Sequence, residues 1–464
     1  MGIVLRPPVE VGVITGKLQN ASDSQSLPKS TAEQIFQEEQ LYLAPGVQSI
    51  CLNSRLVIDH GKGVHVTDLD GRTYMDFFSG VTVGSLGHCH PKYVSALKAQ
   101  LNKVTFGSFT TVPRFEFLKN LAEVAPGNLR RTQLYSGGAE AVEAALRLAR
   151  AHTGKFEVIG FWGGFHGKTG GVLGLVGDRF KHQHGPMAPG LHLAPYANCN
   201  RCPFEVSYPG CSFLCVEFLR KVIRHNTTGS IAAILVEPIQ GTAGNVVPPP
   251  GYLKELQAVA RENGALLIAD EMITGFGRTG KLFGVEHEGI VPDIMTLGKG
   301  MGGGFPVSAL ISTDEIVSAK PFSLPSASSS SYGGNPLAAA AARVTLEIIL
   351  EENLVENSRE VGAWLIRHIE EMAGRYSFVG QVRGRGLMIG VELVRDKKSR
   401  ELLSTQASQA LFQIGLKEGI LLMISSSAIR INPALIISQQ EAARGLEILD
   451  RVFGQIQKTK IHLQ

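Results

Sequence analysis

Residues 266–275 read Leu-Leu-Ile-Ala-Asp-Glu-Met-Ile-Thr-Gly, an apolar run of strand length that ends on two acidic residues. Because every position of the run is apolar, it predicts a strand covered on both faces, as in a parallel sheet. Similar runs occur along the chain, and helical stretches such as 140–151 and 252–262 separate them. The alternation predicts an α/β fold with a mostly parallel central sheet covered by helices. The other strand candidates are Val158–Phe161, Ile231–Val236, Ile294–Leu297 and Val307–Ile311.

The regions on either side of these strands have a different texture. Two alternating runs within Val64–Phe77 flank Asp70-Gly71, which predicts a β-hairpin. After Pro336, long amphipathic helices dominate, and Gly386–Val394 supplies a short strand. A chain of 464 residues is too long for one small core, so we expect a second, smaller α+β domain. The predicted division is a flexible N-terminal arm at 1–34, an N-terminal segment of the small domain at 35–85, a large domain at 86–345 and the rest of the small domain at 346–464.

Composition excludes several classes of protein. Charged residues make up 19% of the chain, and the net charge of +4 comes from interspersed basic and acidic side chains, so no basic face indicates nucleic acid or an anionic membrane. The longest apolar runs have strand length, which excludes a membrane span. The N-terminal 34 residues lack the charged start and apolar middle of a secretion signal, so we expect a cytoplasmic protein.

Lys299 stands in an unusual setting, within Thr296-Leu297-Gly298-Lys299-Gly300-Met301-Gly302-Gly303-Gly304. It follows an apolar strand directly, where a buried ammonium is costly unless it is paired or neutralised. The alternative is a surface lysine in a flexible loop. The surrounding glycines favour a flat, bulky group lying against the backbone, and a lysine with a lowered pKa can form an imine with such a group.

Two further motifs complement this lysine. Asp270 ends a strand too apolar for an idle carboxylate, which predicts a buried cation or a protonated ring nitrogen beside it; a helix N-cap and a metal ligand are the alternatives. The segment Tyr135-Ser136-Gly137-Gly138-Ala139-Glu140 turns at glycines into an alanine-rich helix. Free backbone N–H groups and the helix dipole make such a start a natural phosphate site, although many helices begin after a glycine.

Together these motifs resemble the class III aminotransferases, the ω-aminotransferase-like branch of the fold-type-I enzymes that depend on pyridoxal 5′-phosphate (PLP). The resemblance extends from about Gln37 to Phe453. Further matching segments are Gly87-His88-Cys89-His90-Pro91, Gly164-Phe165-His166-Gly167, Val236-Glu237-Pro238-Ile239-Gln240-Gly241, Gly275-Phe276-Gly277-Arg278-Thr279-Gly280 and Tyr332-Gly333-Gly334-Asn335-Pro336.

The resemblance implies a role for each matching site residue. Lys299 would bind PLP as a Schiff base and, once substrate displaces it, move a proton between the substrate carbon and the cofactor. Asp270 would keep the pyridine nitrogen protonated, so that the ring accepts electrons. Phe165 would stack on one face of the ring and Met272 on the other.

The remaining implied contacts involve the phosphate, the ring surroundings and the substrate. Gly138 and Ala139 would donate backbone N–H groups to the phosphate, and Ser331, where the family usually has threonine, would reach it from the partner chain of a homodimer. Glu237 would support the ring through hydrogen bonds. Arg430 matches the arginine that binds the substrate carboxylate; an exposed arginine at a strand end is the alternative. Two interpretations of His166 stay open, a residue at the ring edge and a satisfied buried histidine.

Three positions depart from the branch that handles 4-aminobutyrate or ornithine, which argues against those substrates. Ile273 stands where many members have a glutamine, and Thr242 where those enzymes have a glutamate that shields the carboxylate-binding arginine. Lys168 replaces an arginine for a distal carboxylate, and lysine cannot form the bidentate contact. Without a glutamate at 242, Arg430 is predicted to be open in both half-reactions.

Four cysteines form the cluster Cys199-x2-Cys202-x8-Cys211-x3-Cys215, called here the cysteine cluster. The spacing is compatible with a small zinc site, yet a second Cys-x2-Cys turn is missing. We therefore predict free thiols in a surface insertion and no bound metal.

The predicted function is the transfer of an amino group from an amino acid or amine to a 2-oxo acid such as pyruvate or 2-oxoglutarate. An amino-acid racemase or epimerase is the alternative enzyme, because it needs the same lysine and the same electron-accepting ring. A non-catalytic PLP-fold binding protein is disfavoured, since Lys299 and Asp270 are both present.

Overall fold

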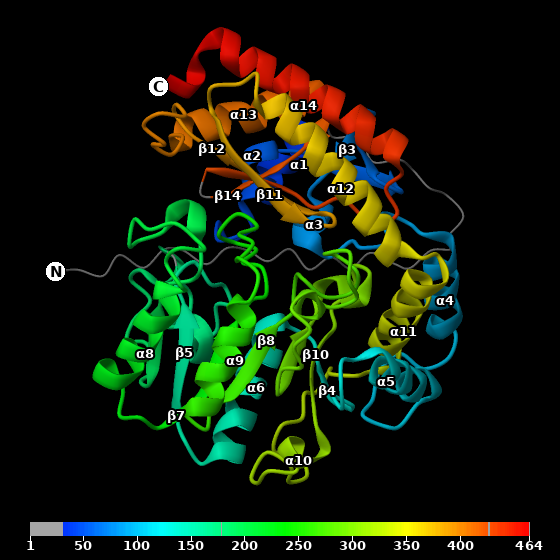
Figure 1. Cartoon of the computed structure of the whole chain (residues 1–464). Helices are drawn as coiled ribbons and strands as arrows, with labels where there is room; N and C mark the ends of the chain where they lie inside the picture. The colour runs from blue at the N-terminus through cyan, green and yellow to red at the C-terminus, as the bar shows by residue number, and fades with distance from the viewer. Residues whose placement is uncertain (1–30, 178, 426, 464) are drawn as a thin grey trace, which may run out of the picture.

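The computed structural model describes residues 31–177, 179–425 and 427–463, and three sheets organise it (Figure 1). The central sheet has seven strands. β10 runs antiparallel to both of its neighbours, whereas the pairs from β9 to β6 are parallel, which confirms the predicted mostly parallel sheet. In spatial order the strands are β4 (Arg131–Tyr135), β10 (Ser308–Ser312), β9 (Ile294–Leu297), β8 (Leu266–Asp270), β7 (Ile231–Val236), β5 (Glu157–Phe161) and β6 (Leu191–Ala194).

Helices cover both faces of this sheet, as the apolar strands require. On β7, Ala233 and Leu235 pack into the same core cluster as α6 (Gly138–Thr153). The alternate residues Ile234 and Val236 pack into the other cluster, which includes α9 (Tyr252–Glu262). Since neighbouring side chains of a strand point to opposite faces, one run of six apolar residues serves both cores. α8 (Leu214–Asn226) packs beside α9, while α7 (Gly170–Leu173) and α10 (Asp314–Val317) contact α6.

A group of three helices lies beside the central sheet. α11 (Pro336–Glu351) packs against α4 (Pro91–Leu101) and α5 (Val112–Val124). The predicted domain boundary after residue 345 falls inside α11, which is continuous. The domain limits therefore stay predictions.

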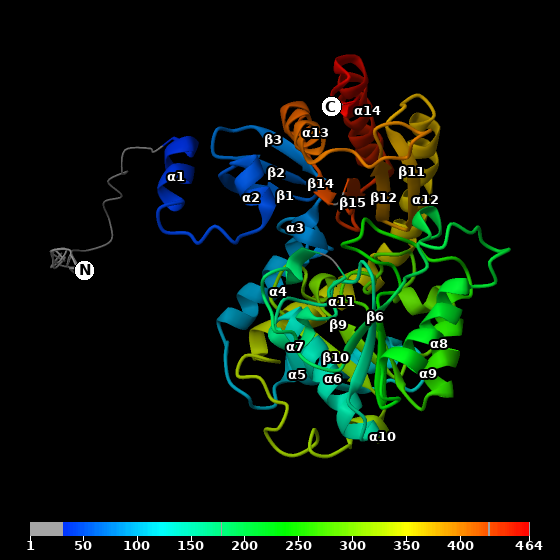
Figure 2. The same ribbon diagram turned by 90° about the vertical axis from the view of Figure 1, so that its left-hand side faces the viewer.

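The two smaller sheets lie together on one side of the central sheet (Figures 1 and 2). β2 (His65–Asp68) and β3 (Thr73–Asp76) form the predicted hairpin, with Gly71 at a φ of 83° in its turn. β13 (Ile420–Leu421) pairs with β3, so the N-terminal segment joins the C-terminal part of the chain. The remaining elements of this region are α2 (Ser49–Ser54), β1 (Ile58–Lys62), α12 (Leu354–Ala373), β11 (Val379–Arg385), β12 (Met388–Leu393), α13 (Thr405–Glu418), β14 (Met423–Ser425), β15 (Ala428–Ile431) and α14 (Gln439–Thr459).

Residues 1–30 of the predicted N-terminal arm lie outside the described residues. α1 (Ala32–Glu39) begins within the last residues of that arm, because Thr31 and Gln34 form a capping box at its start. Among the described helices, none is both long and apolar enough to cross a membrane.

Candidate active site

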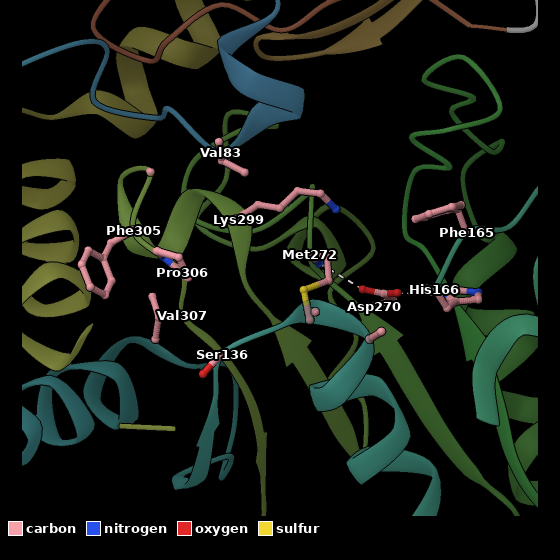
Figure 3. A pocket seen from close by; sticks show the side chains of 14 residues that line it. Val83, Ser136, Phe165, His166, Asp270, Met272, Lys299, Phe305, Pro306 and Val307 are labelled. Atoms are coloured by element: carbon pink, nitrogen blue, oxygen red, sulfur yellow. Dashed lines mark hydrogen bonds and ion pairs between the residues drawn. The ribbon is translucent and has the colours of Figure 1, made fainter. Parts of the chain in front are cut away.

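The predicted site residues follow the carboxyl ends of strands that run in the same direction. β4, β5, β7, β8 and β9 all end at one edge of the central sheet, where a cavity of about 360 Å³ lies (Figure 3). Ligands of open α/β sheets collect at such an edge. The cavity is lined by Val83, Ser136, Gly138, Ala139, Phe165, His166, Gly167, Asp270, Met272, Lys299 and the segment 304–307.

The Lys299 amine is free to react. Its side chain lines the cavity, and within the described residues it makes no hydrogen bond or ion pair. Figure 3 shows the side chain extended, with the amine on the side of Asp270 and Phe165. Burial lowers the pKa of Lys299 from its ordinary value, and the charge of Arg430 lowers it further, against the opposing carboxylates of Asp270 and Glu237. The lowered pKa increases the fraction of neutral, nucleophilic amine.

Asp270 is held by three contacts at the end of β8. Its Oδ2 lies 2.7 Å from Nδ1 of His166, and its Oδ1 accepts hydrogen bonds from the Met272 N–H and the Thr296 hydroxyl, both at 3.1 Å. Burial alone would lower the pKa of His166, but the hydrogen bond and charge of Asp270 outweigh it and raise that pKa. His166 therefore satisfies both interpretations left open above: it lines the cavity, and it is buried and paired.

Two glycines lie close to the Met272 side chain beside the cavity. A Cβ added to Gly298 would lie 2.5 Å from the Met272 sulfur, and one added to Gly138 would lie 3.2 Å from it. Gly138 and Ala139 form the first turn of α6, where backbone N–H groups have no intrahelical partner. This turn opens onto the cavity, so it can bind an anion there.

Glu237 and Ser331 do not line the cavity in this chain. Glu237 lies behind it, where its two carboxylate oxygens accept the N–H groups of Phe165 at 2.8 Å and Gly241 at 2.9 Å. Glu237 is therefore a support for the loop that carries Phe165. Ser331 is exposed in the loop before α11.

Arg430 is buried, so the prediction that it stands open is wrong for this structure. The residue is 1% exposed, and Gly241 is one of its neighbours: a Cβ added to Gly241 would lie 3.5 Å from the Arg430 Nη2 atom. The buried Nη2 atom has no hydrogen-bond partner, and Nε makes a long hydrogen bond of 3.4 Å to Oδ1 of Asn245. Burial lowers the pKa of Arg430 to about 10, although the charge of Glu237 raises it in part.

Sequence reasoning missed the residues that hold the site from behind. Thr296 lies within the lysine motif, which assigns it no role, and Asn245 belongs to none of the motifs above. The signal for Thr296 is a hydroxyl inside an otherwise apolar strand, Ile-Met-Thr-Leu. A buried polar group at such a position needs a partner, which is Asp270.

The cysteine cluster lines one small cavity between the short 3₁₀ turn Cys199–Arg201 and the start of α8. All four thiols are free, and burial raises the pKa of Cys215 to about 11, which keeps that thiol protonated. Among the residues that the structure describes, no group of three or more His, Cys, Asp or Glu side chains is arranged to hold a metal. The absence of bound metal stays a prediction.

Comparisons with known proteins cover most of the chain. The family profile of the class III aminotransferases matches residues 48–453. The chain belongs to the class III aminotransferases. Acetylornithine aminotransferase of Methanopyrus kandleri is 37% identical over 389 residues, which cover 83% of this chain and 91% of that protein. A leucine/methionine racemase of Thermococcus litoralis is 32% identical over 415 residues, which cover 88% and 92%. The crystal structure of an amine transaminase from an uncultivated Pseudomonas species, in its PLP-bound form, superposes with a TM-score of 0.83 at 31% identity and covers 89% of this chain and 98% of that one.

This aminotransferase is a PLP-dependent enzyme of fold type I that moves an amino group from an amino acid or amine to a 2-oxo acid. The residues present fit PLP: a free lysine amine, a buried aspartate and an open helix start face one cavity, and glycines at 138 and 298 leave room for the Met272 side chain that lines it. When bound, PLP supplies an aldehyde for the amino group and a ring that withdraws electrons from the substrate carbon.

Proposed function

We propose that this aminotransferase acts on α-amino acids and on 2-oxo acids that carry one carboxylate beside the reacting carbon. The observation that carries the proposal is Arg430. Its guanidinium is buried, keeps an unsatisfied Nη2 donor and lies within 4.0 Å of no carboxylate among the described residues. A buried, uncompensated cation is costly, and a substrate carboxylate offers the charge and the two acceptors that a guanidinium matches.

Arg430 is also electrostatically linked to the reacting amine. Its charge lowers the pKa of Lys299. A carboxylate bound at Arg430 would neutralise that charge, so substrate binding and the protonation of Lys299 are coupled in this proposal. Because Arg430 is buried in this structure, the groups packed around it must shift to admit the carboxylate.

The other site residues have roles that follow from their positions. Lys299 would carry the proton between the substrate α-carbon and the cofactor. Asp270, anchored by His166 and Thr296, would keep a negative charge beside the ring nitrogen. Phe165 and Met272 would bracket the ring. The N–H groups of Gly138 and Ala139 would bind the phosphate.

The position of Lys168 argues against substrates with a distal carboxylate or amine. Lys168 is exposed, and its Nζ lies 4.9 Å from the ring centroid of Phe180, which packs edge-on against Phe165. Its ammonium is a hydrated point charge and cannot form a bidentate clamp. We therefore propose that pyruvate is a better acceptor than 2-oxoglutarate, and that 4-aminobutyrate and ornithine are poor donors.

We further propose a homodimer in which Ser331 reaches the phosphate of the neighbouring site. Exposed apolar side chains gather between α4 and α5, where Phe106 is 78% and Phe109 80% exposed, and Tyr332 next to Ser331 is 73% exposed. Such a surface is typical of an interface. A cytoplasmic location suits the six cysteines, which are all free thiols.

The test is a panel of α-amino acids and simple amines, each incubated with and without pyruvate or 2-oxoglutarate, while chirality and keto-acid formation are followed. Keto acid formed only with an acceptor, and faster with α-amino acids than with amines, supports the proposal. Loss of chirality without an acceptor would instead indicate racemisation, the second candidate, which the racemase relative favours.

A further inference from the structure

We infer that Asn245 is a positioning residue for Arg430 and that, through Asn432, it ties the arginine to the left-handed turn that brings Val83 to the cavity wall. The inference rests on the proposed carboxylate role of Arg430. It adds a hydrogen-bond network that sets the direction of the guanidinium and the position of the residue that covers the substrate.

The side-chain amide of Asn245 makes hydrogen bonds to three groups. It is fully buried, with a φ of 56°. Its Nδ2 donates to the carbonyl of Ile389 in β12 and to Oδ1 of Asn432, both at 2.8 Å. These two bonds fix the amide orientation, so that Oδ1 faces Nε of Arg430. A side chain pinned by two good hydrogen bonds can orient a third group even through a long contact.

Asn432 extends the network to the N-terminal segment. Its Nδ2 donates to the hydroxyl of Thr82 at 2.7 Å, and its backbone N–H donates to the carbonyl of Phe77 at 2.9 Å. Asn432 is 2% exposed. The network therefore joins β12, the end of β15 and the segment before the cavity, which are far apart in sequence.

The turn that ends at Thr82 has a backbone conformation that neighbouring groups must stabilise. α3 (Ser79–Thr82) has positive φ at all four residues, from 47° to 70°, so it is a left-handed turn. Non-glycine residues adopt this conformation only under constraint. Asp76 holds the start of the turn by accepting the N–H groups of Phe78 and Ser79, and Asn432 holds its end at Thr82. Val83, the next residue, lines the cavity.

The proposed positioning role depends on the lack of charge on the Asn245 side chain. A carboxylate at this position would pair with Arg430 and compete with the carboxylate of the substrate. An amide orients Nε and leaves the guanidinium charge uncompensated, so the substrate supplies the counter-charge. The network thus sets the affinity for carboxylate substrates without touching the cofactor residues.

The decisive variant is Asn245→Asp, studied in the holoenzyme. The KM for an α-amino acid such as alanine is expected to rise at least tenfold, while kcat changes less than threefold and the KM for 1-phenylethylamine stays unchanged. Propionate, a carboxylate that has no amino or keto group, serves as a probe of binding alone. Its stabilisation of the holoenzyme against heat is expected to weaken by the same factor.

Two further variants keep the test falsifiable. Thr82→Val removes the acceptor of Asn432 at the far end and is expected to raise the KM for the amino acid about threefold; it decides the question if Asn245→Asp does not fold. Asn357→Asp is the matched control, because Asn357 also donates its amide to two carbonyls, those of Leu435 and Ile437, but does not reach Arg430. Its KM values are expected to match those of the parent enzyme.

The outcomes separate this inference from the proposed function. If Arg430→Lys leaves propionate binding unchanged, the carboxylate role of Arg430 is wrong. If Arg430→Lys weakens propionate binding but the Asn245 and Thr82 variants do not, the positioning inference alone is overturned. Equal rises in KM for the amino acid and for 1-phenylethylamine would also overturn it, since they would indicate a purely structural role.

Discussion

Thr296→Val is the substitution that most directly tests how Asp270 is held. Valine conserves the shape of threonine but removes the hydroxyl that donates to Oδ1 of Asp270 at 3.1 Å. Thr296 is fully buried and Asp270 is 2% exposed, so water cannot replace the lost donor. Oδ1 keeps the Met272 N–H, and Oδ2 keeps His166. The carboxylate therefore loses one of three contacts rather than its charge partner.

The expected cost is that of a hydrogen bond to a charged group, about 1.5 to 3 kcal/mol of unfolding free energy. Thr345→Val supplies a matched control in α11. Thr345 is also fully buried, but its hydroxyl has no hydrogen-bond partner. Removing a buried, unsatisfied hydroxyl is expected to be neutral or stabilising by up to about 1 kcal/mol. Two chemically identical substitutions are thus expected to shift stability in opposite directions.

The assay is urea unfolding of both variants and the parent apoenzyme, with PLP retention of the holoenzymes after dialysis as a second measurement. Thr296→Val is expected to unfold at lower urea and to lose PLP sooner, because Asp270 is less firmly placed. Equal urea midpoints for the two variants would refute the reasoning, since the Thr296 hydroxyl would then contribute nothing to Asp270.

Four other predictions concern single groups. Borohydride reduction and peptide mapping are expected to place the pyridoxyl label on Lys299; a label on another lysine contradicts the assignment. Ser331→Ala is expected to weaken PLP binding by about 1 to 3 kcal/mol, measured by equilibrium dialysis, and unchanged affinity would exclude sharing between subunits. Burial lowers the pKa of His287 from 6.5 to about 4, so its contribution to stability is complete above pH 6.5 and is lost as the pH falls to 4; because the side chain is partly exposed and solvent screens its charge, the loss of unfolding free energy relative to His287→Gln is expected to be about 1 to 2 kcal/mol over that range. Elemental analysis is expected to find no zinc in the cysteine cluster, and near-stoichiometric zinc would show the opposite.

Most of the central sheet could be predicted because its strands are apolar on both faces. β7 and β8 contain only buried residues, and such runs have few alternatives. β4 was missed because Arg131-Thr132-Gln133 is polar: it lies at the edge of the sheet, where one side has no neighbouring strand. The β2–β3 hairpin was predictable from its Asp-Gly turn. The pairing of β13 with β3 was not, because the partners are more than 300 positions apart and β13 has two residues.

The site residues likewise include some whose position could be predicted from the sequence and some whose position could not. Asp270 is the last residue of β8, and Lys299 and Phe165 lie in the loops that follow β9 and β5, so strand prediction places them at one edge together. The prediction that Arg430 is open rests on the absence of a glutamate at 242, whereas the neighbours of Arg430 in the structure include Gly241 and Asn245. Such burial arises from packing between distant segments, which no local pattern reveals.

This division bears on how substrate choice can change within one family. The groups proposed to face the cofactor lie at the carboxyl edge of the central sheet: Asp270 ends β8, and Lys299 begins the 3₁₀ turn after β9. The groups proposed to select the substrate, Arg430 and Val83, come from the smaller sheets and the segment joined to them, and Asn245 bridges the two parts. A substitution in the bridge can therefore alter carboxylate binding while the cofactor chemistry stays intact. The chain is similar both to an acetylornithine aminotransferase and to a leucine/methionine racemase, so its family includes relatives named for different reactions. In the proposed function, the choice of substrate depends on what Arg430 and its neighbours admit, because Lys299 would serve transamination and racemisation alike.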